Sequence, residues 1–173
     1  KRPIYVITGF LGSGKTTLLN HLVNHAEMQD TAVIINEFGE VGIDHMLVKS
    51  SFEDAIVLKN GCVCCTIRGD LLDTLETLAV REERDEIPCF SRVVIETTGL
   101  ADPAPILQTL MMEPIITARY DLSSIVTTVD TLNALSQLTD NPEAVKQVAI
   151  ADLLLLTKTD MTKTLDIQLA SKL

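Results

Sequence analysis

The fold of this chain follows from eight residues near its N-terminus, Gly9-Phe10-Leu11-Gly12-Ser13-Gly14-Lys15-Thr16. They match the pattern G-x-x-x-x-G-K-[ST] in full. A short run at residues 3–8, rich in β-branched side chains, precedes them, and apolar residues at helical spacing follow over residues 15–24. A strand, a glycine-rich loop and a helix in this order are typical of a loop that binds phosphate groups.

The residue types in this loop suit the binding of a nucleoside triphosphate. Glycines let consecutive backbone N–H groups turn toward an anion, and the start of the helix adds the positive end of its dipole. We expect Lys15 to reach the β- and γ-phosphates and to act in catalysis, and the Thr16 hydroxyl to hold Mg²⁺. The other contacts of this loop with the nucleotide are expected from Gly12, Ser13, Gly14 and Thr17.

Further apolar runs along the chain are expected to form strands, at residues 31–35, 55–58, 92–96, 124–129 and 152–157. Helical patterns lie between most of them, at residues 70–80, 104–112, 131–138 and 143–150. Strands that are apolar on both faces and alternate with helices indicate a mostly parallel sheet covered on two sides. This order predicts an α/β fold, the three-layer P-loop NTPase fold with a mostly parallel central sheet flanked by helices.

The length of 173 residues fits one domain over residues 1–173. No internal repeat or change in composition marks a linker. The sequence stops where residues 165–173 begin a possible helix, so we expect it to be a fragment of a longer protein.

The net charge of −10 argues against binding to nucleic acid or to an anionic membrane, because a basic surface is missing. No signal peptide is visible, and no apolar run approaches the roughly 20 residues needed to cross a bilayer. A cytoplasmic location is therefore expected. In a reducing compartment, cysteines crowded into one loop indicate metal or redox chemistry rather than a disulfide framework.

Thr157-Lys158-Thr159-Asp160 follows the last apolar run, at the end of a strand where open α/β sheets bind ligands. The Asp160 carboxylate is expected to accept hydrogen bonds from N1–H and the exocyclic amine of guanine, whereas adenine would leave it unpaired. Lys158 is expected to lie along the plane of the base with its aliphatic stem. The pattern therefore favours GTP and GDP over adenine nucleotides; a solvated loop with ordinary charges is the alternative.

The run at residues 92–96 ends in Glu96, and Gly99 follows three residues later. An acidic residue at this place can hold a Mg²⁺-bound water or orient the attacking water, which makes Glu96 a catalytic candidate. The Gly99 N–H is expected to sense the γ-phosphate. An acidic strand end that merely faces solvent is the alternative.

Two further loops carry candidate metal ligands. Glu37 lies in Asn36-Glu37-Phe38-Gly39-Glu40 after the second apolar run and is a candidate ligand for Mg²⁺ or for a second metal. Gly61-Cys62-Val63-Cys64-Cys65 places three thiols within four residues, and thiolates suit a soft or borderline ion such as Zn²⁺.

Three thiolates are one ligand short of a closed tetrahedral site, and such an open site suits a metal that is loaded and released. Glu37, Glu40 and His45 are candidates for the fourth ligand. The alternatives are a hinge loop with surface carboxylates at residues 36–40 and a redox or buried cysteine cluster at residues 62–65. Cys89, which stands apart from these, is expected in the core.

Taken together, the motifs Gly-Phe-Leu-Gly-Ser-Gly-Lys-Thr-Thr, Asn-Glu-Phe-Gly-Glu, Gly-Cys-Val-Cys-Cys, Glu-Thr-Thr-Gly-Leu-Ala-Asp-Pro and Thr-Lys-Thr-Asp resemble those of the CobW-type metallochaperone GTPases. The resemblance covers residues 3–160, and the hydrogenase and urease nickel-insertion GTPases are more distant relatives. It implies a slow GTPase whose nucleotide state is coupled to the binding of Zn²⁺ or Co²⁺ at Cys62, Cys64 and Cys65. A client metalloprotein or metal-insertion complex is the implied partner.

The chain departs from the pattern of the family in two ways. Thr157 stands where many GTPases have asparagine, so a weaker tether to the phosphate loop is expected. The smaller C-terminal domain of the family, which often carries histidine-rich segments, is missing from the sequence. A P-loop kinase acting on a small molecule and a non-enzymatic zinc-binding scaffold are the alternative functions.

Overall fold

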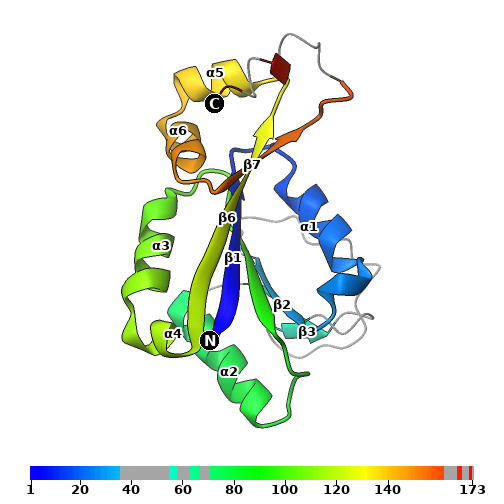
Figure 1. The fold of residues 1–173 in the computed structure, drawn as a ribbon, viewed down its shortest axis with the longest axis vertical. Coiled ribbons are helices and arrows are strands. Elements are labelled where there is room, and N and C mark those ends of the chain that lie inside the picture. The colour runs from blue at the N-terminus through cyan, green and yellow to red at the C-terminus, as the bar shows by residue number, and fades with distance from the viewer. Residues whose placement is uncertain (36–54, 58–62, 67–70, 162–166, 169–171, 173) are drawn as a thin grey trace.

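The structure is a computed structural model and describes residues 1–35, 55–57, 63–66, 71–161, 167–168 and 172. Its centre is one seven-stranded sheet with the strand order β3-β4-β2-β5-β1-β6-β7 (Figure 1). The strands are β1 (Arg2–Gly9), β2 (Thr31–Ile35), β3 (Ala55–Val57), β4 (Val63–Thr66), β5 (Arg92–Glu96), β6 (Tyr120–Asp130) and β7 (Leu153–Thr157).

Every neighbouring pair in the sheet is parallel except β3 and β4. A parallel connection needs a crossover of about a dozen residues or more. Only residues 58–62 lie between β3 and β4, too few for such a crossover, and the pair is antiparallel. The prediction of a mostly parallel central sheet is confirmed, with one antiparallel strand at its edge.

Helices cover both faces of the sheet (Figure 1). They are α1 (Lys15–Val23), α2 (Leu71–Glu83), α3 (Pro103–Met112), α4 (Pro114–Arg119), α5 (Ala134–Asp140) and α6 (Pro142–Ala149), with a 3₁₀ turn η1 (Ala26–Met28) after α1. The predicted helices are confirmed with ends shifted by a few residues. The short helix α4 was not foreseen; it begins at a proline, which is a common first residue of a helix.

The alternation of side chains along β1 shows how the two faces are built. Ile4 and Val6 point into the larger core, together with leucines of α2 and Leu110 of α3. Ile7 points the other way and packs with Leu19 of α1. Because successive residues of a strand face opposite sides, an apolar strand such as β1 supports a helical layer on each side.

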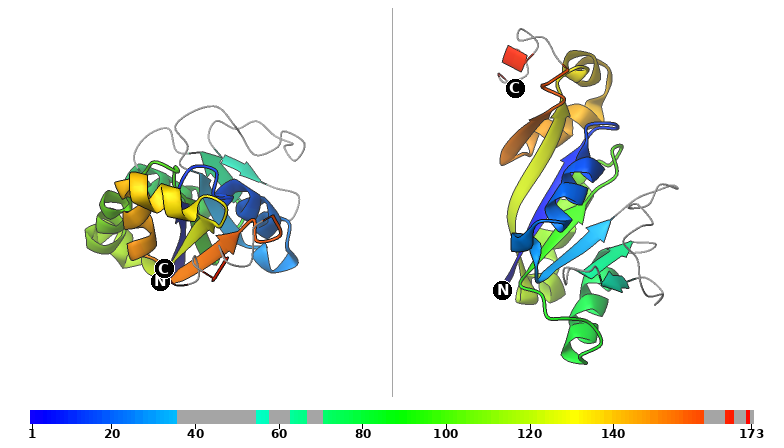
Figure 2. Two further views of the ribbon diagram at one scale, coloured as in Figure 1. Left: turned by 90° about the horizontal axis from the view of Figure 1, so that it is seen from above. Right: turned by 90° about the vertical axis from the view of Figure 1, so that its right-hand side faces the viewer.

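The helices are also divided along the length of the sheet. Figure 2 shows α5 and α6 near one end of the strands and α2 near the other. The end with α5 and α6 is the carboxyl end of the parallel strands, where the phosphate loop leaves β1. Open α/β sheets bind their ligands at this edge.

Two expectations on the cysteines change with the structure. Residues 63–66 form strand β4, so Cys64 and Cys65 belong to the sheet and not to a loop after it. Cys89 is exposed and not part of the core, in the irregular segment before β5. Among the described residues, no helix is long and apolar enough to cross a membrane.

Candidate functional site

The phosphate loop joins β1 to α1 and lies close against β6. A Cβ atom on Gly9 would come within 2.3 Å of Thr128 Oγ1 and 2.5 Å of the Thr128 carbonyl oxygen. Gly14 is the residue before α1 and has a φ of +93°, a conformation that other residues rarely adopt. These glycines are therefore required by the close approach of the backbone and by the sharp turn into the helix.

A cavity of about 380 Å³ opens above this loop. It brings together three of the predicted elements, the phosphate loop, the Glu96–Gly99 segment and the residue after β7. Its lining residues are Leu11, Gly12, Gly14, Lys15, Thr16, Thr17, Glu96, Thr97, Thr98, Gly99 and Lys158. Most of the residues expected to bind the nucleotide thus line the same cavity.

Lys15 and Ser13 take different places in the loop. Lys15 lines the cavity, and its Nζ atom donates to the Phe10 carbonyl oxygen at 3.2 Å, so the ammonium group crosses the loop. Ser13 is fully buried behind the loop, where its hydroxyl lies 2.6 Å from Thr128 Oγ1 and its N–H donates to Phe10 O. Ser13 thus braces the loop against β6 and is not among the residues that line the cavity.

Thr16 and Glu96 meet at the floor of the cavity. The Thr16 hydroxyl donates to Glu96 Oε1 at 2.8 Å, and Glu96 is 1% exposed. Hydroxyl and carboxylate oxygens are the ligands that Mg²⁺ prefers, alone or through water. The donor set therefore fits Mg²⁺, the ion expected at this loop, and Glu96 is buried and does not merely face solvent.

The Glu96–Gly99 segment touches the phosphate loop directly. A Cβ atom on Gly99 would lie 2.7 Å from the Leu11 N atom and 2.8 Å from Leu11 Cα. At the base of the segment, Thr97 Oγ1 donates to Thr8 Oγ1 at 2.9 Å, which ties β5 to β1. This places Gly99 at the rim of the cavity, where its N–H was expected to meet the γ-phosphate.

At the carboxyl end of β7, Thr157 contacts the phosphate loop and Lys158 follows it at the cavity. The Thr157 hydroxyl donates to Ser13 O at 2.8 Å, so the expected tether is made by threonine in place of asparagine. Lys158 adopts a φ of +57° and lines the cavity. Asp160 is exposed and is not among the residues that line this cavity.

Asp130, the last residue of β6, holds Lys158 in place and was not foreseen. Its Oδ2 atom accepts from Lys158 Nζ at 2.7 Å, and the side chain of Asp130 is 2% exposed. Burial alone raises the pKa of Asp130, but hydrogen bonds from Lys158, from Asn133 and from the Leu132 N–H outweigh it and hold the pKa below its ordinary value. Asp130 is therefore charged when it binds Lys158.

The sequence carried a signal for this residue. Thr127, Thr128 and Asp130 are polar residues at the end of an apolar run, in the same relation to β6 as Glu96 has to β5. Parallel strands bring such ends to one edge of the sheet. Gln147 of α6 was missed as well, and no feature of its sequence neighbourhood distinguishes it.

The candidate metal ligands are placed only in part. Glu37 and Cys62 lie outside the described residues, as do Glu40 and His45. The backbone of β4 pairs Cys64 with Val33 and Cys65 with Ile34 of β2. Among the residues that are described, no group of three or more His, Cys, Asp and Glu side chains could hold a metal ion.

The sequence of the chain matches the family model CobW/HypB/UreG, nucleotide-binding domain, over residues 3–172. The chain is 42% identical over 158 residues to the zinc chaperone YjiA of Escherichia coli, which covers 91% of the chain and 49% of that relative. It is 34% identical over 166 residues to the zinc-regulated GTPase metalloprotein activator 1 of Schizosaccharomyces pombe, covering 92% of the chain and 39% of that relative.

A solved structure agrees with these relatives. The crystal structure of Zn(II)-bound YjiA GTPase from E. coli superposes with a TM-score of 0.82 at 38% identity, over 99% of this chain and 53% of that one. The chain thus spans about half the length of this relative. The similarity to a solved GTPase extends over the sheet and the phosphate loop described above.

Proposed function

The chain belongs to the family of CobW/HypB/UreG nucleotide-binding domains, and from this premise we propose that it hydrolyses GTP and uses its nucleotide state to control the binding and delivery of a transition metal. The observation that carries the nucleotide part is the Thr16–Glu96 hydrogen bond inside the cavity of the phosphate loop. It joins the residue expected to hold Mg²⁺ to the acidic residue expected to place water.

The proposed hydrolysis uses charge and position. Lys15 would stabilise the negative charge that builds up on the β- and γ-phosphates. Thr16 and Glu96 would hold Mg²⁺, whose charge supports phosphoryl transfer. A water oriented near Glu96 would form a bond to the γ-phosphorus while the bond from that phosphorus to the bridging oxygen breaks, which yields GDP, inorganic phosphate and a proton.

The preference for guanine is proposed for the segment after β7. Lys158 lines the cavity and is held by Asp130, and its aliphatic stem would lie along the plane of the base. Asp160 lies two residues further along and would accept the two hydrogen bonds that guanine offers. Adenine nucleotides would leave that carboxylate unpaired.

The metal part of the proposal rests on Cys62, Cys64 and Cys65, with Glu37 as a further candidate ligand. Ile34, the register partner of Cys65, lies three residues before Glu37 in the sequence. Relatives named as zinc chaperones favour Zn²⁺ as the cargo, with Co²⁺ as the second candidate. Delivery would be to a client metalloprotein, and in the cytoplasm the thiols would stay reduced.

The nucleotide would act on the metal through the segment that follows β2. GTP and Mg²⁺ would order the loop around Glu37, and the thiolates would then capture the metal. Loss of the γ-phosphate would relax the loop and let the metal pass to the client. The coupling is a difference in metal affinity between the two nucleotide states.

The decisive experiment measures Zn²⁺ and Co²⁺ affinity by competition titration, with GDP and with a non-hydrolysable GTP analogue. We expect at least about 10-fold tighter binding in the GTP-like state, a coupling of about 1.4 kcal/mol. Cys64→Ala should abolish the difference, and Cys89→Ala, which changes the exposed cysteine before β5, should leave it unchanged.

Equal metal affinity in both nucleotide states would contradict the coupling and favour a zinc-binding scaffold. Phosphoryl transfer to an acceptor other than water, together with a preference for ATP, would favour a small-molecule kinase. Steady release of phosphate from GTP without any acceptor supports the GTPase.

A further inference from the structure

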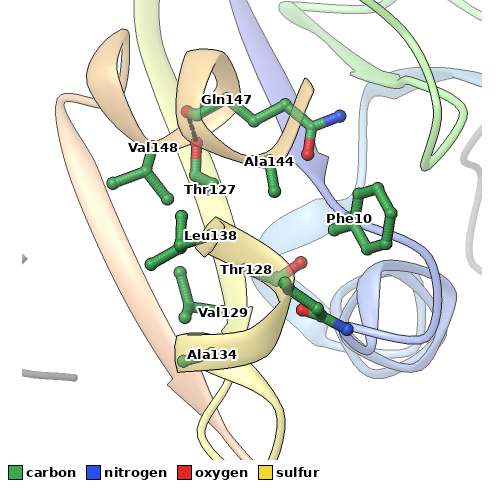
Figure 3. A pocket seen from close by; sticks show the side chains of 10 residues that line it. Phe10, Thr127, Thr128, Val129, Ala134, Leu138, Ala144, Gln147 and Val148 are labelled. Atoms are coloured by element: carbon green, nitrogen blue, oxygen red, sulfur yellow. Dashed lines mark hydrogen bonds between the residues drawn. The ribbon is translucent and has the colours of Figure 1, made fainter. Parts of the chain in front are cut away.

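Gln147 of α6 is a fully buried glutamine whose side-chain NH₂ group donates two hydrogen bonds to the loop between β5 and α3. It is 0% exposed, and its Nε2 atom donates to Gly99 O at 3.1 Å and to Ala101 O at 3.0 Å. The backbone carbonyl oxygen of Gln147 accepts from the Thr127 hydroxyl at 2.8 Å, which fixes α6 on β6 (Figure 3). Glutamine is mostly found exposed, so a buried one with this pattern of bonds needs an explanation.

The loop that Gln147 binds is the one expected to sense the γ-phosphate. On its other side, Gly99 packs so closely on Leu11 that no side chain fits between them. The segment that holds Gly99 therefore lies between the phosphate loop and α6. Gly99 has a direct contact with each of these two neighbours.

A second bond from α6 reaches the end of the same loop. Lys146, the residue before Gln147, donates to Asp102 Oδ2 at 2.6 Å. Asp102 in turn accepts from the Ala104 N–H and caps the start of α3. Two consecutive residues of α6 thus hold residues 99–102 along their length.

The side-chain oxygen of Gln147 shows that packing alone does not explain a glutamine at this position. Its Oε1 atom is buried and has no hydrogen-bond partner among the described residues. Gln147 lines a small hollow of about 10 Å³ together with Phe10 of the phosphate loop and Ala144 of α6 (Figure 3). A methionine of similar length would remove this unpaired oxygen, but it would also leave the Gly99 and Ala101 carbonyl oxygens without the donors that Gln147 supplies. These two donated bonds are therefore what distinguishes the glutamine from an apolar residue at this place.

We propose that Gln147 is a positioning residue for nucleotide sensing: it holds the Gly99 carbonyl so that the N–H of the same residue stays aimed at the γ-phosphate. This inference rests on the proposed GTPase function. When the γ-phosphate binds or is lost, the Gly99 N–H gains or loses its acceptor and the Gly99 segment shifts. Gln147, which is bonded to this segment, transmits the shift to α6. Contacts to the α- and β-phosphates come from the phosphate loop and do not depend on Gln147.

The test compares Gln147→Met with the matched control Gln137→Met, which makes the same change in a residue that lines the same hollow from α5. The affinities for GDP and for a non-hydrolysable GTP analogue are measured by displacement of a fluorescent nucleotide, and hydrolysis by single turnover. We expect Gln147→Met to keep its GDP affinity within about twofold. It should lose about 10-fold in affinity for the analogue and at least as much in hydrolysis rate, whereas Gln137→Met matches the unsubstituted protein.

A measurement on the unsubstituted protein does not depend on whether the variant folds. The side-chain amide resonances of Gln147 should exchange slowly with solvent and should shift between the GDP and analogue states. Rapid exchange in both states would overturn the inference. So would equal losses of both nucleotides in Gln147→Met, or an unchanged rate of hydrolysis.

These outcomes are separable from failure of the proposed function. If the unsubstituted protein hydrolyses GTP and Gln147→Met does so equally well, only the role of Gln147 is overturned. If the unsubstituted protein does not hydrolyse GTP, the proposed function falls, and this inference falls with it.

Discussion

Asp130 and Lys158 form an ion pair in which one partner is buried and the other is partly in solvent. The side chain of Asp130 is 2% exposed and that of Lys158 is 34% exposed. Lys158 has a left-handed backbone conformation, which costs free energy for a residue with a side chain. The pair helps to hold that conformation and with it one wall of the nucleotide cavity.

Replacing Asp130 by asparagine should lower the free energy of unfolding at pH 7 by about 1–3 kcal/mol, because charge-assisted hydrogen bonds are lost. The folded-state pKa of Asp130 lies below its ordinary value of 3.8. Its contribution is therefore complete above the unfolded-state pKa and is lost as the pH falls through the folded-state pKa. Urea unfolding at pH 7, 5 and 3 measures this difference.

The gap between the two proteins should be the same at pH 7 and pH 5 and smaller at pH 3. A gap that grows as the pH falls would show that another group controls the site. Asp140→Asn, on the exposed end of α5, is a control for the change in net charge.

The hydroxyl of Thr157 links β7 to the phosphate loop. Its Oγ1 atom donates to Ser13 O at 2.8 Å, and Thr131 Oγ1 donates to Thr157 O at 2.7 Å. A threonine offers one donor where the amide of an asparagine offers two. The tether between β7 and the phosphate loop is therefore present, and the expectation that it is weaker rests on the smaller number of donors.

Thr157→Val keeps the shape of the side chain and removes the donor to Ser13 O. We expect a loss of about 0.5–1.5 kcal/mol in the free energy of unfolding and a few-fold weaker binding of GDP. Urea unfolding and nucleotide displacement check these values. Thr117→Val, which removes an exposed hydroxyl bonded within α4, should leave GDP affinity unchanged; an equal loss there would contradict the assignment.

At the scale of elements, the phosphate loop depends on two different properties of glycine. Gly9 is needed because β6 lies against it, with a Cβ contact of 2.3 Å to Thr128 Oγ1. Gly12 has a φ of +70°, but a Cβ atom there would meet nothing within 4 Å. Gly9, with a φ of +140°, is limited both by space and by backbone conformation, whereas Gly12 is limited only by backbone conformation.

Gly9→Ala should therefore displace the loop from β6 and weaken GDP binding by at least about 100-fold, or about 2.7 kcal/mol. Gly12→Ala should cost only about 1–2 kcal/mol of stability, the strain of a left-handed alanine. Nucleotide displacement and thermal unfolding of both variants measure the contrast. Equal effects of the two substitutions would show that space behind the loop is not what limits Gly9.

Elements with a local pattern were predictable, and those that depend on distant partners were not. The motif at residues 9–16 and the helical spacing after it lie within one stretch of chain, so sequence alone located β1, the loop and α1. Strand β4 is only four residues long and is a strand because it pairs with β2. Three cysteines close together favoured a loop of metal ligands, and nothing local indicated that pairing.

At the scale of the whole molecule, the same limit explains which parts of the site were missed. Glu96 and Lys158 were identified because each ends or follows a strand within a short motif. Asp130 acts on Lys158 across three intervening elements of the chain, and Gln147 acts on Gly99 across four. Such contacts follow from the strand order, which places β5 and β6 on the two sides of β1 and cannot be read from spacing along the chain.

That strand order also sets a sequence of events during synthesis on the ribosome. The phosphate loop emerges before β5, β6 and β7, yet β1 has as neighbours β5 and β6, and the tether to Ser13 comes from the last residue of β7. Contacts between distant parts of a chain form slowly, and the exposed edges of unpaired strands favour aggregation. The phosphate loop thus gains its full set of supporting contacts only after β7 has been made, so tight nucleotide binding is expected to follow the assembly of this sheet.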